Sequence, residues 1–185
     1  NANHVWRTQY TIETDKPVGS LRVALLSDSH MGTTFHADGF AGRLADVQAQ
    51  EPDVAVFVGD FTDESTTRED MVAAARALGA LKPPCGVYFV FGNHDKNNYE
   101  GEGRAYTGEE LAAELTKNGV VVLEDEIVSI GDGFCLIGRQ DASEETENRG
   151  GRASMAELTR NLDENKFSIV LDHQPRDYAN QAASG

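Results

Sequence analysis

Short apolar runs alternate with helix-forming stretches along most of the chain. Four runs are nearly continuous in apolar residues, which is typical of strands buried on both faces of a sheet: residues 21–27, 54–58, 87–91 and 167–171. Shorter or more loosely alternating segments predict further strands at residues 4–14, 120–124, 126–130 and 134–138. Gly131, Asp132 and Gly133 predict a hairpin turn between the last two.

The stretches between these runs predict helices. Apolar spacing and helix-forming composition place them at residues 38–49, 68–81, 108–118 and from Ser154 to about residue 162. Thr107 with Glu110, and Ser154 with Glu157, have the spacing of capping boxes at helix starts. The polar stretch 141–151 is predicted to be a loop. Because no repeat or linker interrupts the alternation, we expect one α/β domain over residues 1–185 with a mixed sheet.

Composition excludes several classes of protein. The chain has 185 residues, 39% of them hydrophobic and 25% charged, which is ordinary for a globular domain. Its formal net charge of −15 argues against a nucleic-acid surface. No apolar run approaches the roughly 20 residues of a membrane span, and the start at Asn1 does not resemble a signal peptide. Cys85 and Cys135 lack metal-site spacing and are interpreted as core residues.

Polar groups capable of binding metal follow each of the four apolar runs. They are Asp28 with His30, Asp60, Asn93 with His94, and His173. The carboxyl ends of strands in an open α/β sheet collect at one edge, where ligands bind, so these groups can converge. Asp28 and His30 are two residues apart, and on an extended segment both side chains would face one cation. Each residue alone could be a cap or a structural histidine, but their joint occurrence at four strand ends favours a site.

The strand-end motifs resemble those of the calcineurin-like metallophosphoesterases. The motifs are DSH at residues 28–30, GDFTD at 59–63 and GNHD at 92–95, in the family's order. With DHQP around His173, the resemblance extends from about residue 21 to 175 and narrows to membrane-associated bacterial phosphoesterases of the YkuE type. It implies a sandwich of two mixed sheets flanked by helices. It also implies a natural protein with a membrane anchor before Asn1.

The resemblance implies a binuclear metal site that hydrolyses a phosphomonoester or a phosphodiester. By it, Asp28 and His30 would hold a first ion, Asn93 and His173 a second, and Asp60 would bridge both. A shared carboxylate and a shared hydroxide offset the repulsion between two close cations, and the hydroxide would be the nucleophile. The donor set suits Mn, Fe or Zn and does not choose among them. Oligomeric state and compartment are not indicated.

The resemblance also assigns an acid beside the metals. His94 matches the family histidine that assists the leaving group or stabilises developing charge. Asp63 matches the acid that orients this histidine in the related phosphoprotein phosphatases, and we favour it over Asp95. Asp95 has the alternative of a structural role in the turn after its strand.

One family feature has no counterpart in this chain. The family completes its site with a Gly-His-x-His loop, and no such motif occurs here. The resemblance therefore implies a metallophosphoesterase domain that ends before the last histidine motif. The alternative is a catalytically inactive metal-binding or partner-binding domain of the same fold. A Rossmann-type nucleotide-binding module is disfavoured because no G-x-G-x-x-G follows the first strand.

His36, Arg139 and Arg176 have two interpretations each. His36 could meet a substrate, although a solvated loop histidine is favoured. Arg139 and Arg176 could contact a phosphate or form surface salt bridges. The acidic run of Glu144, Glu145 and Glu147 is interpreted as a solvated loop.

Overall fold

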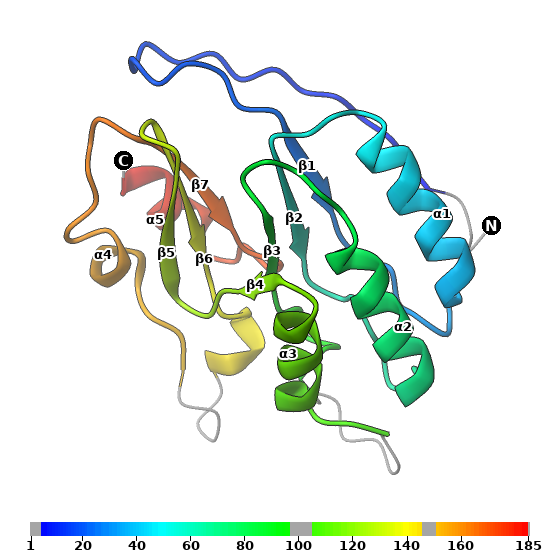
Figure 1. Cartoon of the computed structure of the whole chain (residues 1–185). Coiled ribbons are helices and arrows are strands. Elements are labelled where there is room, and N and C mark those ends of the chain that lie inside the picture. Colours follow the sequence, from blue (N-terminus) through cyan, green and yellow to red (C-terminus); the bar gives the residue numbers. More distant parts are fainter. Residues whose placement is uncertain (1–4, 97–104, 146–150, 185) are drawn as a thin grey trace.

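A computed structural model describes residues 5–96, 105–145 and 151–184 and contains two β-sheets (Figure 1). The first sheet has the strand order β1-β2-β3-β4, and all its neighbouring pairs are parallel. Its strands are β1 (Val23–Leu26), β2 (Val54–Val58), β3 (Val87–Val90) and β4 (Val120–Val122). The second sheet is mixed: β5 (Glu126–Ile130) pairs antiparallel with β6 (Phe134–Gly138), which pairs parallel with β7 (Phe167–Leu171).

Three helices cover one face of the first sheet: α1 (Ala37–Gln48), α2 (Arg68–Gly79) and α3 (Gly108–Lys117) (Figure 1). Strand β2 is buried on both faces because its alternate residues enter two different cores. Ala55 and Phe57 pack in the cluster that includes the helices, whereas Val54, Val56 and Val58 pack against the second sheet. This two-sided burial explains the continuous apolar runs in the sequence.

The inner faces of the two sheets form the second core. Leu136 of β6 and Leu171 of β7 pack there with Val56 and Val90 of the first sheet. Two short helices, α4 (Met155–Leu158) and α5 (Tyr178–Ala183), lie on the opposite face of the second sheet. A groove of about 440 Å³ runs between them and is lined by residues that include Ile137 and Val170. The predicted α/β sandwich of two sheets flanked by helices is confirmed, but only the second sheet is mixed, because the described strands of the first sheet are all parallel.

Most predicted elements are present with small changes at their ends. Both predicted capping boxes form, at Thr107 with Glu110 and at Ser154 with Glu157. The helix predicted from Ser154 to about residue 162 ends at Leu158, four residues earlier. The segment predicted to be a loop at 141–151 contains a 3₁₀ turn, Ala142–Glu145, within its described part. Helix α5 was not predicted.

The strand predicted at residues 4–14 is wrong for its described part. Residues 5–14 form no strand, and in Figure 1 this blue segment runs along the outside of the fold. Its apolar side chains are exposed, with Trp6 at 85% and Tyr10 at 83%. The alternating pattern is suitable for a strand, but no neighbouring strand pairs with it among the described residues. None of the described helices is long and apolar enough to cross a membrane.

Candidate metal centre

Backbone hydrogen bonds hold the loop after β1 against the loop after β2. The Asp28 amide donates to Gly59 O (3.0 Å) and the His30 amide donates to Asp60 O (3.1 Å). The Ser29 hydroxyl donates to Phe61 O at 2.8 Å. The two motifs, DSH and GDFTD, are therefore adjacent at the carboxyl ends of their strands.

The sequence predicts an extended segment at Asp28 and His30, but the loop after β1 is not extended. Asp28 and His30 have φ angles of 57° and 39°, in the left-handed region that residues with side chains rarely adopt. Asp60 has a φ of 52°. The side chains of Asp28 and His30 still approach each other, with His30 Nε2 3.9 Å from Asp28 Oδ1. Such backbone strain is characteristic of functional sites and is maintained here by the hydrogen bonds between the two loops.

Asp60, Asp28 and His30 form a cluster of potential ligands. His30 Nε2 lies 3.9 Å from Asp28 Oδ1 and 3.7 Å from Asp60 Oδ2. One ligand atom from each of the three lies within 4.8 Å of the others. Asp28 is exposed and Asp60 is buried, so the cluster spans from solvent into the protein. Two carboxylates and an imidazole at this spacing are a donor set that fits a divalent cation.

His173 approaches the same carboxylate from the second sheet. Its Nε2 lies 3.1 Å from Asp60 Oδ2, and its Nδ1 lies 2.9 Å from Val58 O. A carbonyl oxygen only accepts, so this contact places a proton on Nδ1 and leaves Nε2 to face Asp60. In its neutral form the ring thus presents a lone pair toward the cluster, which is the state in which histidine binds metals.

The contact between His173 and Asp60 raises the pKa of His173 and lowers that of Asp60. Burial by itself lowers the pKa of His173, but the hydrogen bonds to Asp60 and Val58 and the charge of Asp60 outweigh it and raise the pKa to about 9. Burial raises the pKa of Asp60, but the contact with His173 and the amide of His94 outweigh it, and the pKa falls below its ordinary value. Without a cation, the charges of Asp60 and protonated His173 therefore balance each other.

Asn93 lies in the loop that follows β3. It is buried, and its Oδ1 accepts a hydrogen bond from Gln174 Nε2. The next residue, His94, donates its backbone N–H to Asp60 Oδ1 at 3.0 Å. The GNHD loop thus orients one oxygen of Asp60 while His30 and His173 face the other. Sequence reasoning gave no role to Gln174, although its place beside His173 in DHQP was a usable signal.

Two glycines make this packing possible. A Cβ on Gly59 would lie 2.5 Å from the His173 ring and 2.8 Å from Gly92 Cα, and Gly59 also has a φ of +76°. A Cβ on Gly92 would overlap the carboxylate and the backbone nitrogen of Asp60. The glycines of the GD and GN motifs are therefore required by the close approach of β2, β3 and His173.

The expected orienting acid for His94 requires a correction. His94 Nδ1 lies 2.9 Å from Glu64 Oε1, so the acid at hydrogen-bond distance is Glu64 and not Asp63. The Asp63 side chain accepts from Ser65 N (2.8 Å) and faces His30 Nδ1 at 3.9 Å. Burial raises the pKa of Asp63, but hydrogen bonds from the side chain of Thr33 and from Ser65 outweigh it and hold the pKa below its ordinary value. The motif spacing could not reveal which of two successive acids turns toward the histidine.

The contacts of Asp95 fit the structural role in the turn after its strand. It is fully buried, and its carboxylate accepts the amides of Thr62 and Gly92, both at 2.9 Å. Burial raises the pKa of Asp95 to about 6. Its contacts tie the loop after β3 to the loop after β2, and through them it supports Asp60 and Asn93.

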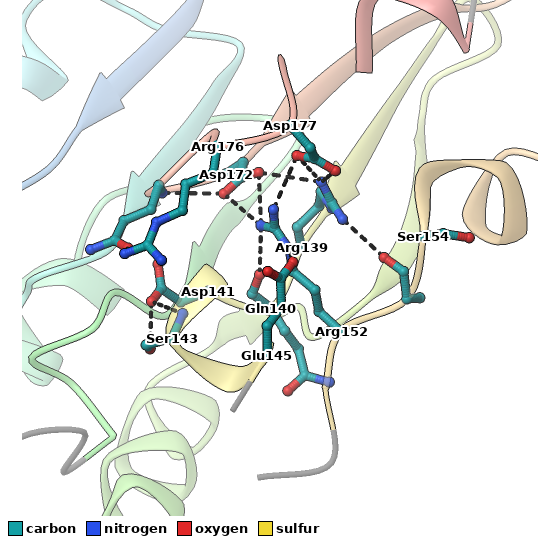
Figure 2. A network of polar contacts seen from close by, with 12 residues as sticks. Arg139, Gln140, Asp141, Ser143, Glu145, Arg152, Ser154, Asp172, Arg176 and Asp177 are labelled. Carbon is teal, nitrogen blue, oxygen red and sulfur yellow. Dashed lines mark hydrogen bonds and ion pairs between the residues drawn. The ribbon is translucent and has the colours of Figure 1, made fainter. Parts of the chain in front are cut away.

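Asp172, the residue before His173, belongs to a buried ion-pair network (Figure 2). Arg139 Nη1 lies 2.8 Å from Asp177 Oδ1 and 3.4 Å from Asp172 Oδ2. Arg152 Nη1 lies 3.0 Å from Asp172 Oδ2, and its Nη2 lies 3.0 Å from Asp177 Oδ1. Both arginine side chains are 1% exposed. Both interpretations of Arg139, a phosphate contact and a surface salt bridge, are therefore wrong, because its charge is buried and paired.

The remaining candidates lie outside the cluster. His36 is exposed, with its Nδ1 3.8 Å from Asp70 Oδ2. Arg176 is exposed and donates to Gln174 Oε1 at 2.8 Å. Glu144 is buried, so its interpretation as a solvated residue is wrong, whereas Glu145 pairs with Arg152 at 2.7 Å. Glu147 lies outside the described residues.

Comparisons with known proteins give consistent results. The model of the family described as calcineurin-like phosphoesterase matches residues 21–184. An uncharacterized metallophosphoesterase of Aquifex aeolicus is 30% identical over 171 residues, which cover 91% of this chain and 61% of that protein. A transmembrane protein with metallophosphoesterase domain of Danio rerio is 32% identical over 160 residues, covering 85% of this chain and 36% of that protein. The uncharacterized metallophosphoesterase YkuE of Bacillus subtilis is 27% identical, covering 91% and 57%.

Among solved structures, the nuclease MPE of Pseudomonas putida is similar with a TM-score of 0.38 and 21% identity, covering 63% of this chain and 53% of that one. The chain spans between about a third and three fifths of the length of these curated relatives.

Proposed function

Because this chain belongs to the calcineurin-like phosphoesterase family, we propose that it hydrolyses a phosphomonoester or phosphodiester with two divalent metal ions held around Asp60. When bound, such ions supply a hydroxide nucleophile and neutralise charge on the ester oxygens. Asp28 and His30 would hold the first ion, Asn93 and His173 the second, and Asp60 both. Mn, Fe and Zn all suit these donors.

The observation that carries this proposal is the position of the Asp60 carboxylate. Its Oδ2 lies 3.7 Å from His30 Nε2 and 3.1 Å from His173 Nε2. Its Oδ1 is held by the His94 amide, so the carboxylate cannot rotate freely. A buried carboxylate fixed between two imidazoles of different strands has the arrangement that a bridging ligand needs.

Other side chains would act on the substrate. His94 lies next to this cluster, its ring packed edge to face against His30 with the centroids 5.1 Å apart. From there it would donate a proton to the leaving group or stabilise charge on the phosphoryl oxygens. Asp95 and the glycines would position the loops and take no part in the chemistry.

Hydrolysis of nitrophenyl phosphate and bis(nitrophenyl) phosphate by the full-length protein tests the proposal. We expect turnover with added Mn²⁺ and its loss with a chelator. Asp60→Asn removes the charge that would serve both ions, so we expect it to lose both metal and activity, while Asp38→Asn in α1 serves as the control. Turnover that survives exhaustive chelation, or an Asp60→Asn variant with normal metal content and rate, would contradict the proposal.

A further inference from the structure

We propose that Glu64 is the positioning residue of His94, an inference that rests on the proposed function of the site. The contact between Glu64 Oε1 and His94 Nδ1 is 2.9 Å long, in the range of a charge-assisted hydrogen bond. The two residues come from different loops, after β2 and after β3, and are 30 positions apart in sequence. The contact therefore fixes the histidine relative to the strand that carries Asp60.

The two successive acids of the loop after β2, Asp63 and Glu64, make different contacts. Asp63 is buried and turned inward, where it accepts from Ser65 N and Ser65 Oγ and so closes the loop on itself. The loop is anchored further by Thr66, whose hydroxyl donates to Met31 O. With Asp63 engaged in this turn, the next side chain, Glu64, extends outward to the His94 ring. Its side chain remains 40% exposed, so it contributes little to the core.

The hydrogen bond between Glu64 and His94 determines which ring nitrogen of His94 is left to face a substrate. A carboxylate oxygen accepts hydrogen bonds, so this contact favours the His94 tautomer with its proton on Nδ1, and Nε2 lies on the opposite edge of the ring. A ring held in this tautomer and orientation would present Nε2 to the leaving group. Partners that orient a histidine in this way typically contribute about 10- to 100-fold, as measured for histidines bound to metals.

Steady-state kinetics of Glu64→Ala in the Mn-loaded, full-length protein tests the inference. We expect kcat to fall by about 10- to 100-fold with little change in KM and in metal content. Glu64→Gln keeps an acceptor for Nδ1 and should retain more activity than Glu64→Ala. The control is Glu164→Ala, which removes the same charge from an exposed position before β7 and should behave as the wild type.

A double-mutant cycle separates a role through His94 from an independent one. If Glu64 acts through His94, Glu64→Ala should cost nothing further in a His94→Ala background. Additive losses would overturn the inference, as would a Glu64→Ala variant that matches Glu164→Ala while His94→Ala is impaired. In that last case the proposed function would still stand.

The tautomer of His94 gives a readout that does not need activity. In ¹⁵N NMR spectra of the metal-free and Zn-loaded protein, the wild-type ring should carry its proton on Nδ1, and Glu64→Ala should lose this preference. A wild-type ring protonated only on Nε2 would overturn the inference whether or not the protein hydrolyses esters. Absence of any ester hydrolysis, combined with an Nδ1-protonated ring that depends on Glu64, would instead contradict the proposed function alone.

Discussion

Asp60 combines burial with an unfavourable backbone conformation. Its side chain is 7% exposed and its φ is 52°, and each feature destabilises an ordinary aspartate. The surrounding groups compensate, because His173 and the His94 amide hold its charged form. A carboxylate kept in this state by contacts from the loops after β3 and β7 fits the proposed ligand role.

His94 should be separable from the ligands by mutation. A positioned acid typically contributes about 10² to 10⁴ in rate, so His94→Ala should lose kcat by about that factor and keep its metals. The loss should be smaller for nitrophenyl esters, whose leaving group hardly needs a proton, and larger for alkyl esters. Rates with both ester types, together with metal analysis, test this. Equal losses for both esters would indicate electrostatic stabilisation, and loss of metal would mean that His94 is a ligand.

The identities of the candidate residues were predictable from sequence, but their contacts were only partly so. Asp28, Asp60 and His173 follow strands whose apolar runs are unmistakable, so their common edge could be predicted. The partner of His94 could not, because whether Asp63 or Glu64 turns toward it depends on the turn closed by Ser65. Side-chain direction in such a turn is set by local side-chain hydrogen bonds, which motif spacing does not reveal.

Among the elements, the ends of β2 and β3 fit together with no space for a methyl group. Gly92→Ala should displace the Asp60 carboxylate and destabilise the fold by about 1–3 kcal/mol. We expect weaker metal binding and a large loss of activity. Gly42→Ala in α1 is the matched control, because nothing lies within 4 Å of its added Cβ. Calorimetric titration with Mn²⁺ and urea unfolding measure both effects, and equal behaviour of the two variants would refute this account of the packing.

The ion-pair network fixes the chain that follows β7. Removing Arg139 leaves the buried Asp172 with less compensation, and breaking a buried pair on one side typically costs about 3–5 kcal/mol. Arg139→Met should therefore lower the free energy of unfolding by about 3 kcal/mol or more. The exposed Arg160→Met should change it by no more than about 0.5 kcal/mol. Urea denaturation of the two variants compares them directly, and similar midpoints would show that the network contributes little stability.

Elements were predicted best where one signal dominated. The strand Val54–Val58 was predicted to the residue because both of its faces are buried, and the start of α3 because its capping box is local. The predicted strand at residues 4–14 was wrong for its described part because a strand also needs a neighbour, which local alternation does not reveal. Helix α5 follows Asp177, a residue type common at helix starts, but the helix has only 6 residues and no side-chain cap hydrogen bond, so the signal in its sequence was weak.

For the whole molecule, the alternation of strands and helices predicted the α/β class, and the motif resemblance predicted the two-sheet sandwich. Strand β7 belongs to the second sheet, yet it brings His173 to the first sheet. This arrangement depends on tertiary packing, which local sequence patterns do not encode. Across the sandwich, His173 contacts both Val58 and Asp60 of the first sheet. With a net charge of −15, the molecule repels phosphate esters in general, so bound cations would be needed to attract them locally.

The position of bound Mn²⁺ in crystals of the full-length protein tests the central claim most directly. Anomalous diffraction should show two peaks roughly 3.5–4 Å apart, one on each side of the Asp60 carboxylate. The first should lie next to Asp28 and His30, and the second next to Asn93 and His173. Peaks located away from Asp60, or none at saturating Mn²⁺, would contradict the account.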